Sequence, residues 1–140
     1  MAASPSIPVE VTVAPGGSLP EYATSGAAGA DVRCLGGFTL EPRARLLVPT
    51  GLRVAVPEGF ELQVRPRSGL AFKHGITMAN APGTIDSDYR GEIGVILINH
   101  GAEAVTFAAG DRIGQLVLAP VSRIAWVAVE RLDDSDRGEG

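Results

Sequence analysis

Residues 80–92 concentrate side chains that could do chemistry. The stretch begins with an amide, passes through a Pro-Gly turn, and then carries two acids, a tyrosine and an arginine at 86–90. A carboxylate can orient and deprotonate a water, and a tyrosine ring can pack against a sugar or base. The apolar run at 93–98 follows directly and has the length and β-branched content of a strand. The stretch is therefore expected to form a rigid platform for these groups, although a salt-bridged turn is the alternative role for Asp88 and Arg90.

Three further clusters carry polar groups in positions suited to binding. If a helical turn begins at Ser68, its first amide groups are unpaired and can bind an anion beside Arg67. Asp31 follows a run of small residues, and Gln115 interrupts an apolar run, where a buried amide needs partners. Each residue also has a purely structural alternative. Ser68 could cap the helix beside a surface arginine, Asp31 could form an Asx turn, and Gln115 could hydrogen-bond to the backbone.

Together the clusters favour hydrolysis by an activated water over covalent catalysis. No cysteine or histidine is arranged with Ser68 as a nucleophilic triad would require. The chain instead supplies anion donors, a carboxylate and an aromatic ring, which suits a phosphate ester or anhydride. Mg²⁺, held mostly by the substrate's own phosphates, would neutralise charge, because it keeps several waters and needs only one or two carboxylates.

Composition limits the possible classes of protein. The chain has 140 residues, of which 45% are hydrophobic, and a net charge of −4, which indicates one globular domain without the charge for wrapping nucleic acid. The lone Cys34 cannot form an internal disulfide, and two histidines with one cysteine cannot build a zinc site. No apolar stretch approaches membrane-spanning length and no signal pattern opens the chain, so we expect a soluble, cytoplasmic protein.

Short strands separated by turn signals predict an all-β sandwich, jelly roll or barrel. The runs at 52–56 and 60–64 share one parity around Pro57-Glu58-Gly59, which predicts a hairpin. A short helical turn is expected near 68–72, ended by Gly75. The other expected strands are 7–13, 30–35, 38–40, 45–48, 76–78, 93–98, 105–107, 113–119 and 124–129.

Two of these strands, 93–98 and 113–119, are apolar on both faces. In a small β-sandwich one face of a sheet usually meets water. The second apolar face therefore meets either another subunit or covering loops, and the pattern alone leaves both open.

Four motifs occur in the order and spacing of one enzyme family. They are Ala-Gly-Ala-Asp-Val at 28–32, Pro-Arg-Ser-Gly-Leu-Ala at 66–71, Asn80 with Gly-Thr-Ile-Asp-Ser-Asp-Tyr-Arg-Gly-Glu at 83–92, and Gly-Asp-Arg-Ile-Gly-Gln at 110–115. From about Leu19 to its C-terminus the chain resembles the trimeric dUTP pyrophosphatases (dUTPases). One such motif is a weak signal, whereas four in order are specific.

The resemblance implies a fold, an assembly and a reaction. The fold is a distorted β jelly-roll or barrel subunit, with residues 1–130 as a single dUTPase-like domain. The assembly is a homotrimer whose active sites are shared between subunits. The reaction is Mg²⁺-dependent hydrolysis of dUTP to dUMP and pyrophosphate, which serves dTTP synthesis and keeps uracil out of DNA.

The resemblance also implies a role for each matching residue. Asp86 would activate the water that attacks the α-phosphorus, and Asp31 would contact Mg²⁺ through a water. Tyr89 would lie under the deoxyribose and leave no room for a 2′-hydroxyl. The phosphates would be bound by Arg67, Ser68, Gly69 and Gln115. The uracil edge would be recognised by Asn80 and by the backbone around Gly83, Thr84, Ile85 and Gly94.

The chain departs from the family pattern at its end. Residues 131–140 are acidic and lack an apolar face, so a mobile tail is expected. Arg137-Gly138-Glu139-Gly140 matches only the start of the family's Arg-Gly-x-Gly-Gly-Phe-Gly-Ser-Thr-Gly lid, in which Arg137 would contact the substrate. Closing lids exclude water. We therefore expect this 140-residue form to bind dUTP but to turn it over more slowly than a form with the whole lid.

Three other functions compete with dUTP hydrolysis. A dCTP deaminase-type enzyme of the same superfold would bind a related nucleotide, but its phosphate motif and glutamate-centred site differ from residues 66–71 and Asp86. A lid-less nucleotide-sensing interaction module is a second alternative, which the intact Asp86 and Tyr89 disfavour. A capsid-type jelly roll without a ligand would leave all four clusters unexplained.

Overall fold

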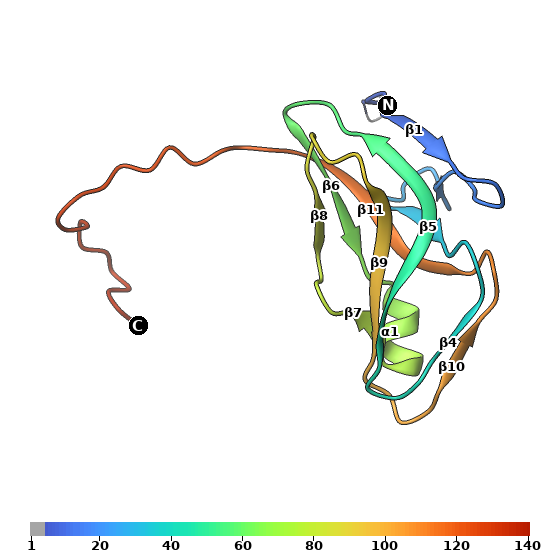
Figure 1. Ribbon diagram of the computed structural model, residues 1–140. Coiled ribbons are helices and arrows are strands. Elements are labelled where there is room, and N and C mark those ends of the chain that lie inside the picture. The colour runs from blue at the N-terminus through green and yellow to red at the C-terminus, as the bar shows by residue number, and fades with distance from the viewer. Residues whose placement is uncertain (1–4) are drawn as a thin grey trace.

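The apolar periodicity of the chain produces eleven strands and one short helix within residues 5–140, the part that the computed structural model describes (Figure 1). The first four residues of the expected domain lie outside this part. In chain order the strands are β1 (Glu10–Val13), β2 (Glu21–Tyr22), β3 (Ala30–Arg33), β4 (Phe38–Leu40), β5 (Arg45–Ala55), β6 (Phe60–Arg65), β7 (Ile76–Met78), β8 (Gly83–Ile85), β9 (Glu92–Asn99), β10 (Val105–Phe107) and β11 (Arg112–Pro120), and the helix α1 is Ser68–His74.

Two antiparallel sheets enclose the core. One sheet has the strand order β1-β5-β9-β7 and the other β2-β3-β11-β6-β8, while β4 and β10 form a separate two-stranded sheet. Alternate residues of both large sheets point inward, such as Val48 and Val95 from one and Val64 and Ile113 from the other, and all four are at most 3% exposed. The all-β fold expected from the sequence is confirmed.

The expected hairpin between residues 52–56 and 60–64 is wrong. Both edges of β5 are already occupied, by β1 and β9, and both edges of β6 are occupied by β11 and β8. The turn at Pro57-Glu58-Gly59 therefore carries the chain from one sheet to the facing sheet. In both runs the alternate apolar side chains point into the same core. Alternation alone cannot distinguish two strands that face each other across a core from two strands that pair side by side.

The strand expected at residues 124–129 is also wrong for the single chain, because no strand follows β11 in the described residues. This part of the chain leads away from the sheets (Figure 1). Ile124, Trp126 and Val127 are 67%, 85% and 81% exposed. Their alternation predicts a half-buried strand, but in the described residues this segment pairs with neither sheet of the same copy. The expected strand at 7–13 is shorter, since β1 begins at Glu10.

The helix is slightly longer than expected and is capped differently. Arg67, and not Ser68, is the residue before its first turn, and the side chain of Arg67 makes no capping hydrogen bond. Gly75 ends the helix in the left-handed conformation, as the sequence predicts. The helix, alone in the described residues, is far too short to span a membrane.

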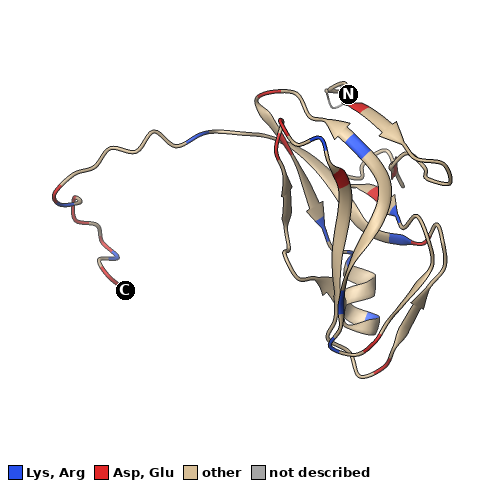
Figure 2. Cartoon of the chain, viewed as in Figure 1, with Lys and Arg blue, Asp and Glu red and all other residues tan. Residues whose placement is uncertain are grey.

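Charged side chains are interspersed over the two sheets and the segment that follows them (Figure 2). Acidic and basic residues both occur along the whole chain, and the net charge is −4. A negatively charged ligand would therefore depend on a few local arginines and on backbone N–H groups.

Asn99 joins the two-stranded sheet to the end of β9. Its side chain is fully buried, donates to the carbonyls of Leu40 (3.0 Å) and Glu103 (2.8 Å), and accepts from the N–H of Gly101 (2.8 Å). One of these contacts is buried and the other two are partly buried, so water has little access to replace the amide. Asn99 is therefore expected to be a major determinant of stability.

We predict that Asn99→Ala lowers the free energy of unfolding by about 2–4 kcal/mol, because it leaves three backbone groups of the interior without partners. Urea unfolding at equal protein concentration measures the loss. Asn80→Ala, at an exposed asparagine, is the control and should change the free energy by less than about 0.5 kcal/mol. Equal effects of the two substitutions would contradict the structural role of Asn99.

Candidate active site

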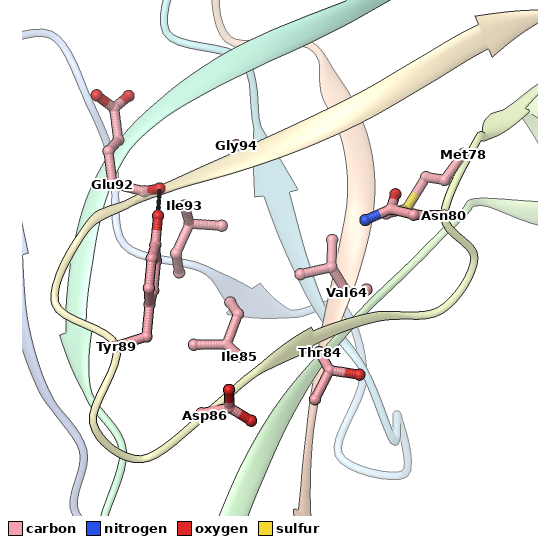
Figure 3. A pocket seen from close by; sticks show the side chains of 11 residues that line it. Val64, Met78, Asn80, Thr84, Ile85, Asp86, Tyr89, Glu92, Ile93 and Gly94 are labelled. Carbon is pink, nitrogen blue, oxygen red and sulfur yellow. Dashed lines mark hydrogen bonds between the residues drawn. The ribbon is translucent and has the colours of Figure 1, made fainter.

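A pocket of about 160 Å³ lies between β8 and the beginning of β9 (Figure 3). Its floor is apolar and its rim carries an amide, a hydroxyl, a carboxylate and a phenol. The floor consists of Val64, Met78, Ile85 and Ile93, and the other lining residues are Asn80, Gly83, Thr84, Asp86, Tyr89, Glu92 and Gly94. Every residue predicted for base, sugar or water contact is therefore in one place on a single copy of the chain.

The pocket lies where two sheet edges are free. β8 is the outermost strand of its sheet. Pairing of β9 with β7 stops at Leu97, after which only the N–H of Ala79 reaches the carbonyl of Ile96, at 3.0 Å. Backbone groups of a strand point to alternate edges, so Gly94, two residues earlier, directs its N–H and C=O to the same side as Ile96. In the described residues no strand pairs with Gly94 on that side, and the pocket occupies the space.

Tyr89 is held in place at one wall. Its hydroxyl donates to the carbonyl of Glu92 at 3.1 Å, and its N–H donates to the carbonyl of Asp86 at 3.1 Å. A Cβ built at Gly91 would collide with the Tyr89 hydroxyl, so glycine at 91 is what lets the ring lie across the turn. The ring is still 45% exposed and is free to contact a ligand.

The turn that carries Asp86 is closed by an arginine. Arg90 donates to the carbonyls of Ser87 (2.6 Å) and Tyr89 (3.1 Å). The salt bridge considered for Asp88 and Arg90 does not form, because the guanidinium contacts carbonyls and the Asp88 carboxylate makes no ion pair in the described residues. Arg90 is thus structural, and Asp86 remains exposed at the rim of the pocket.

A second cluster surrounds Asp31 on β3, whose side chain is only 9% exposed. Arg112 forms an ion pair with it at 3.6 Å, and the Gln115 amide donates to it at 3.4 Å. Asp31 therefore lies within a strand, not in an Asx turn, and Gln115 contacts a side chain instead of the backbone. Gly29 makes room for this contact, since a Cβ there would lie 3.0 Å from the Gln115 side-chain oxygen.

The predicted phosphate contacts lie away from the pocket. Gln115 pairs with Arg65, at the end of β6 that leads to Arg67. Asp86 lies near the other end of β6, because the preceding residue, Ile85, pairs with Leu62. Asp86 and Gln115 are thus separated by about four residues along the strand, roughly 13 Å. Phosphorus atoms of a triphosphate are joined through single bridging oxygens and lie much closer together than that.

The remaining phosphate residues follow the same division. Ser68 and Gly69 are exposed in the first turn of α1, beside the half-buried Arg67. Arg137 is exposed on the segment that leads away from the sheets (Figure 1). One copy of the chain therefore brings together the base, sugar and water residues, but it does not bring them to the phosphate residues.

No group of three or more His, Cys, Asp or Glu side chains could hold a metal ion in the part of the chain that the structure describes. Asp31 has Glu21 opposite it across β2 and β3, and Asp86 shares the pocket with Glu92, so neither place in the described residues gathers three carboxylates. Such a donor set does not suit a metal that is held wholly by protein. It suits Mg²⁺ bound chiefly by phosphates and retaining its waters.

Two polar residues at the site were not predicted from the sequence. Glu92 lines the pocket, and its carboxylate accepts from the N–H of Gly51 at 3.0 Å. Thr50 is 2% exposed and donates to the carbonyl of Ile93 at 2.6 Å. In the sequence, the one feature that could have indicated these two residues is a polar residue beside apolar strand positions, as for Gln115.

Comparisons with known proteins identify the family of the chain. The family model described as dUTPase matches residues 16–140. A deoxyuridine 5′-triphosphate nucleotidohydrolase of Anaeromyxobacter sp. (strain Fw109-5) is 62% identical over 122 residues, covering 87% of this chain and 83% of that protein. The protein of the same name from Fusobacterium nucleatum is 56% identical over 135 residues, covering 95% and 92%.

Solved structures show the same fold. The dUTPase of Staphylococcus bacteriophage 80alpha, with dUPNHPP, has a TM-score of 0.87 at 23% identity, covering 96% of each chain. A mutant of the dUTPase from phage phi11 of S. aureus, described with a structural Mg(II) ion, has a TM-score of 0.81 at 22% identity, covering 89% of this chain and 98% of that one. The chain therefore belongs to the dUTPase family, the family of dUTP diphosphatases that its four ordered motifs predict.

Proposed function

We propose that this protein hydrolyses dUTP to dUMP and pyrophosphate. The observation that carries the proposal is the pocket, which combines Asn80, Tyr89, Asp86 and the free backbone edge at Gly94 on one copy of the chain. Family membership supports it. In the cell the reaction would supply dUMP for dTTP synthesis and keep uracil out of DNA, and a cytoplasmic location stays a prediction.

Selection of the base would depend on fixed groups. Uracil and cytosine differ in the donors and acceptors along one edge, and a site that hydrogen-bonds one of them rejects the other, because mismatched polar groups are left unpaired. The Asn80 amide and the backbone of Thr84, Ile85 and Gly94 would supply that contact. Met78 and Val64 close the floor of the pocket, so shape would exclude the methyl group of thymine.

Asp86 would act on the water. As an exposed carboxylate at the rim of the pocket, it can accept a proton from a water while that water attacks the α-phosphorus. The bond from the α-phosphorus to the bridging oxygen then breaks, and pyrophosphate leaves. Tyr89, fixed through its hydroxyl, would lie under the deoxyribose and orient the nucleotide for this attack.

Mg²⁺ would neutralise the charge on the phosphates and on the leaving group. Asp31 would contact the ion through one of its waters, because this carboxylate is already engaged by Arg112 and Gln115. Gln115, Arg67 and the amides of Ser68 and Gly69 would hold the phosphates themselves. Arg137 is proposed to join them from the C-terminal segment.

We propose further that the active enzyme is a homotrimer with shared sites. The separation between Asp86 and the Gln115 cluster along β6 supports a site completed by the phosphate residues of a second copy. Exposed apolar side chains on β5 and on the 121–132 segment support contacts between copies, since Leu47 and Trp126 are 63% and 85% exposed.

Asp86→Asn should lower the rate of pyrophosphate release from dUTP by about 10²–10⁴-fold, as loss of a general base does. Binding of dUMP should change little, because the amide keeps the size of the side chain. Asp88→Asn is the matched control, an acid two residues away that makes no ion pair in the described residues, and should keep nearly full activity. Full activity in Asp86→Asn would refute the role, while ammonia released from dCTP by the parent protein would favour a deaminase.

Removal of Mg²⁺ with EDTA should abolish dUTP hydrolysis, and added Mg²⁺ should restore it. Asp31→Asn should raise the Mg²⁺ concentration for half-maximal rate by about tenfold, the usual effect of losing a group that contacts a metal through another ligand. The control is Glu21→Gln, at the position that pairs with Asp31 across β2 and β3. An unchanged Mg²⁺ requirement in Asp31→Asn would exclude Asp31 from the metal site.

Mixed assemblies test whether sites are shared. Asp86→Asn and Arg67→Ala are each expected to be nearly inactive when assembled alone. In trimers formed from equal amounts of both, random assortment gives about one quarter of the sites an intact Asp86 from one copy and an intact Arg67 from another. Pyrophosphate release should recover to that extent, whereas an inactive mixture would show that each site is built from one chain.

A further inference from the structure

We propose that Thr50 is a positioning residue for base recognition, acting through the peptide group that joins Ile93 to Gly94. The inference deepens the proposed function and rests on it. Thr50 contacts no ligand-accessible surface, since it is 2% exposed and does not line the pocket. Its hydroxyl lies on the opposite side of β9 from the pocket, where it donates to the Ile93 carbonyl at 2.6 Å.

The contact exists because the pairing of β5 with β9 is interrupted at this point. The register runs without a break from Arg45 opposite Ile98 to Pro49 opposite Gly94, and then shifts, so that Arg53 lies opposite Glu92. Residues 50–52 thus face Ile93 alone. A bulge of this kind leaves backbone groups without ladder partners, and the Thr50 hydroxyl takes the place of the missing donor.

The same hydroxyl also fixes the bulge itself. It accepts from the N–H of Leu52 at 3.2 Å, while the Glu92 carboxylate accepts from the N–H of Gly51 at 3.0 Å. Gly51 adopts a φ of 74°, which favours glycine. The bulge is therefore tied to the first two residues of β9, which is where the pocket begins.

Orientation at Ile93 determines orientation at Gly94. The carbonyl of Ile93 and the N–H of Gly94 belong to one planar peptide group and point in opposite directions. A hydroxyl that holds the carbonyl toward β5 consequently holds the N–H toward the pocket. Leu47 closes the outer face at this point, since a Cβ built at Gly94 would collide with its side chain. The Gly94 N–H is thus oriented by Thr50 on the β5 side of β9, and Leu47 covers Gly94 on the outer face of the sheet.

A donor fixed in this way would recognise a carbonyl oxygen of uracil that cytosine replaces with an amino group. Contact with a part of the substrate that does not react contributes equally to the ground state and the transition state. Its loss should therefore raise KM without lowering kcat. It should also reduce discrimination between dUTP and dCTP, which a general loss of stability would not do.

The test compares Thr50→Val, which keeps the shape and removes the hydroxyl, with Thr50→Ser, which keeps the hydroxyl. Thr39→Val is the matched control, because the Thr39 hydroxyl forms an exposed hydrogen bond with Thr106 on the two-stranded sheet. Thr50→Val should raise the KM for dUTP and the Kd for dUMP by about tenfold, with kcat nearly unchanged and a smaller ratio of dUTP to dCTP in kcat/KM. Thr50→Ser and Thr39→Val should resemble the wild type.

A second measurement follows the donor directly. In the wild type, addition of dUMP should shift the amide proton resonance of Gly94, and that shift should disappear in a folded Thr50→Val protein. An unmoved Gly94 resonance in the wild type, or unchanged KM and discrimination in Thr50→Val, would overturn the role of Thr50. A wild type that neither binds dUMP nor releases pyrophosphate from dUTP would overturn the proposed function and this inference together.

Discussion

Antiparallel pairing between β5 and β9 is the interaction on which both the core and the pocket depend. Through alternation of its side chains, β9 places Ile93, Val95 and Leu97 in the core, each at most 1% exposed. Through alternation of its backbone groups, it directs one edge to β5 and leaves the other edge free at Gly94. The pocket is therefore a consequence of how far β7 extends along β9, and its floor is formed by buried side chains of the core, such as Ile85 and Ile93.

Most strands follow from the sequence because burial of alternate residues is a local signal. Two of the failures concern partners, which are not local. The 52–56 and 60–64 runs both point into the core, yet their strands belong to facing sheets because each edge is already paired. The 124–129 run has the alternation of a strand but pairs with neither sheet of its own copy in the described residues. Alternation predicts which face is covered, and it does not predict what covers it.

The candidate site was predictable to the extent that motifs carry it. Asn80, Asp86 and Tyr89 are close in sequence and meet in one pocket. Contacts across long stretches of chain were not predictable, such as Asp31 with Arg112 and Thr50 with Ile93. They depend on strand register and on a bulge, and register is determined by the whole sheet and not by the residues that happen to lie opposite each other.

The free edges of β8 and β9 have a consequence for how the protein can evolve. Groups that belong to the main chain are present whatever amino acid the codon specifies, so point mutations at Thr84 or Ile85 change the lining of the pocket without deleting its donors and acceptors. Proline is the exception, because it lacks the N–H. A ligand preference that depends on main-chain groups is therefore little affected by substitutions of the surrounding side chains. It would be altered chiefly by mutations, distant in sequence, that tilt a strand.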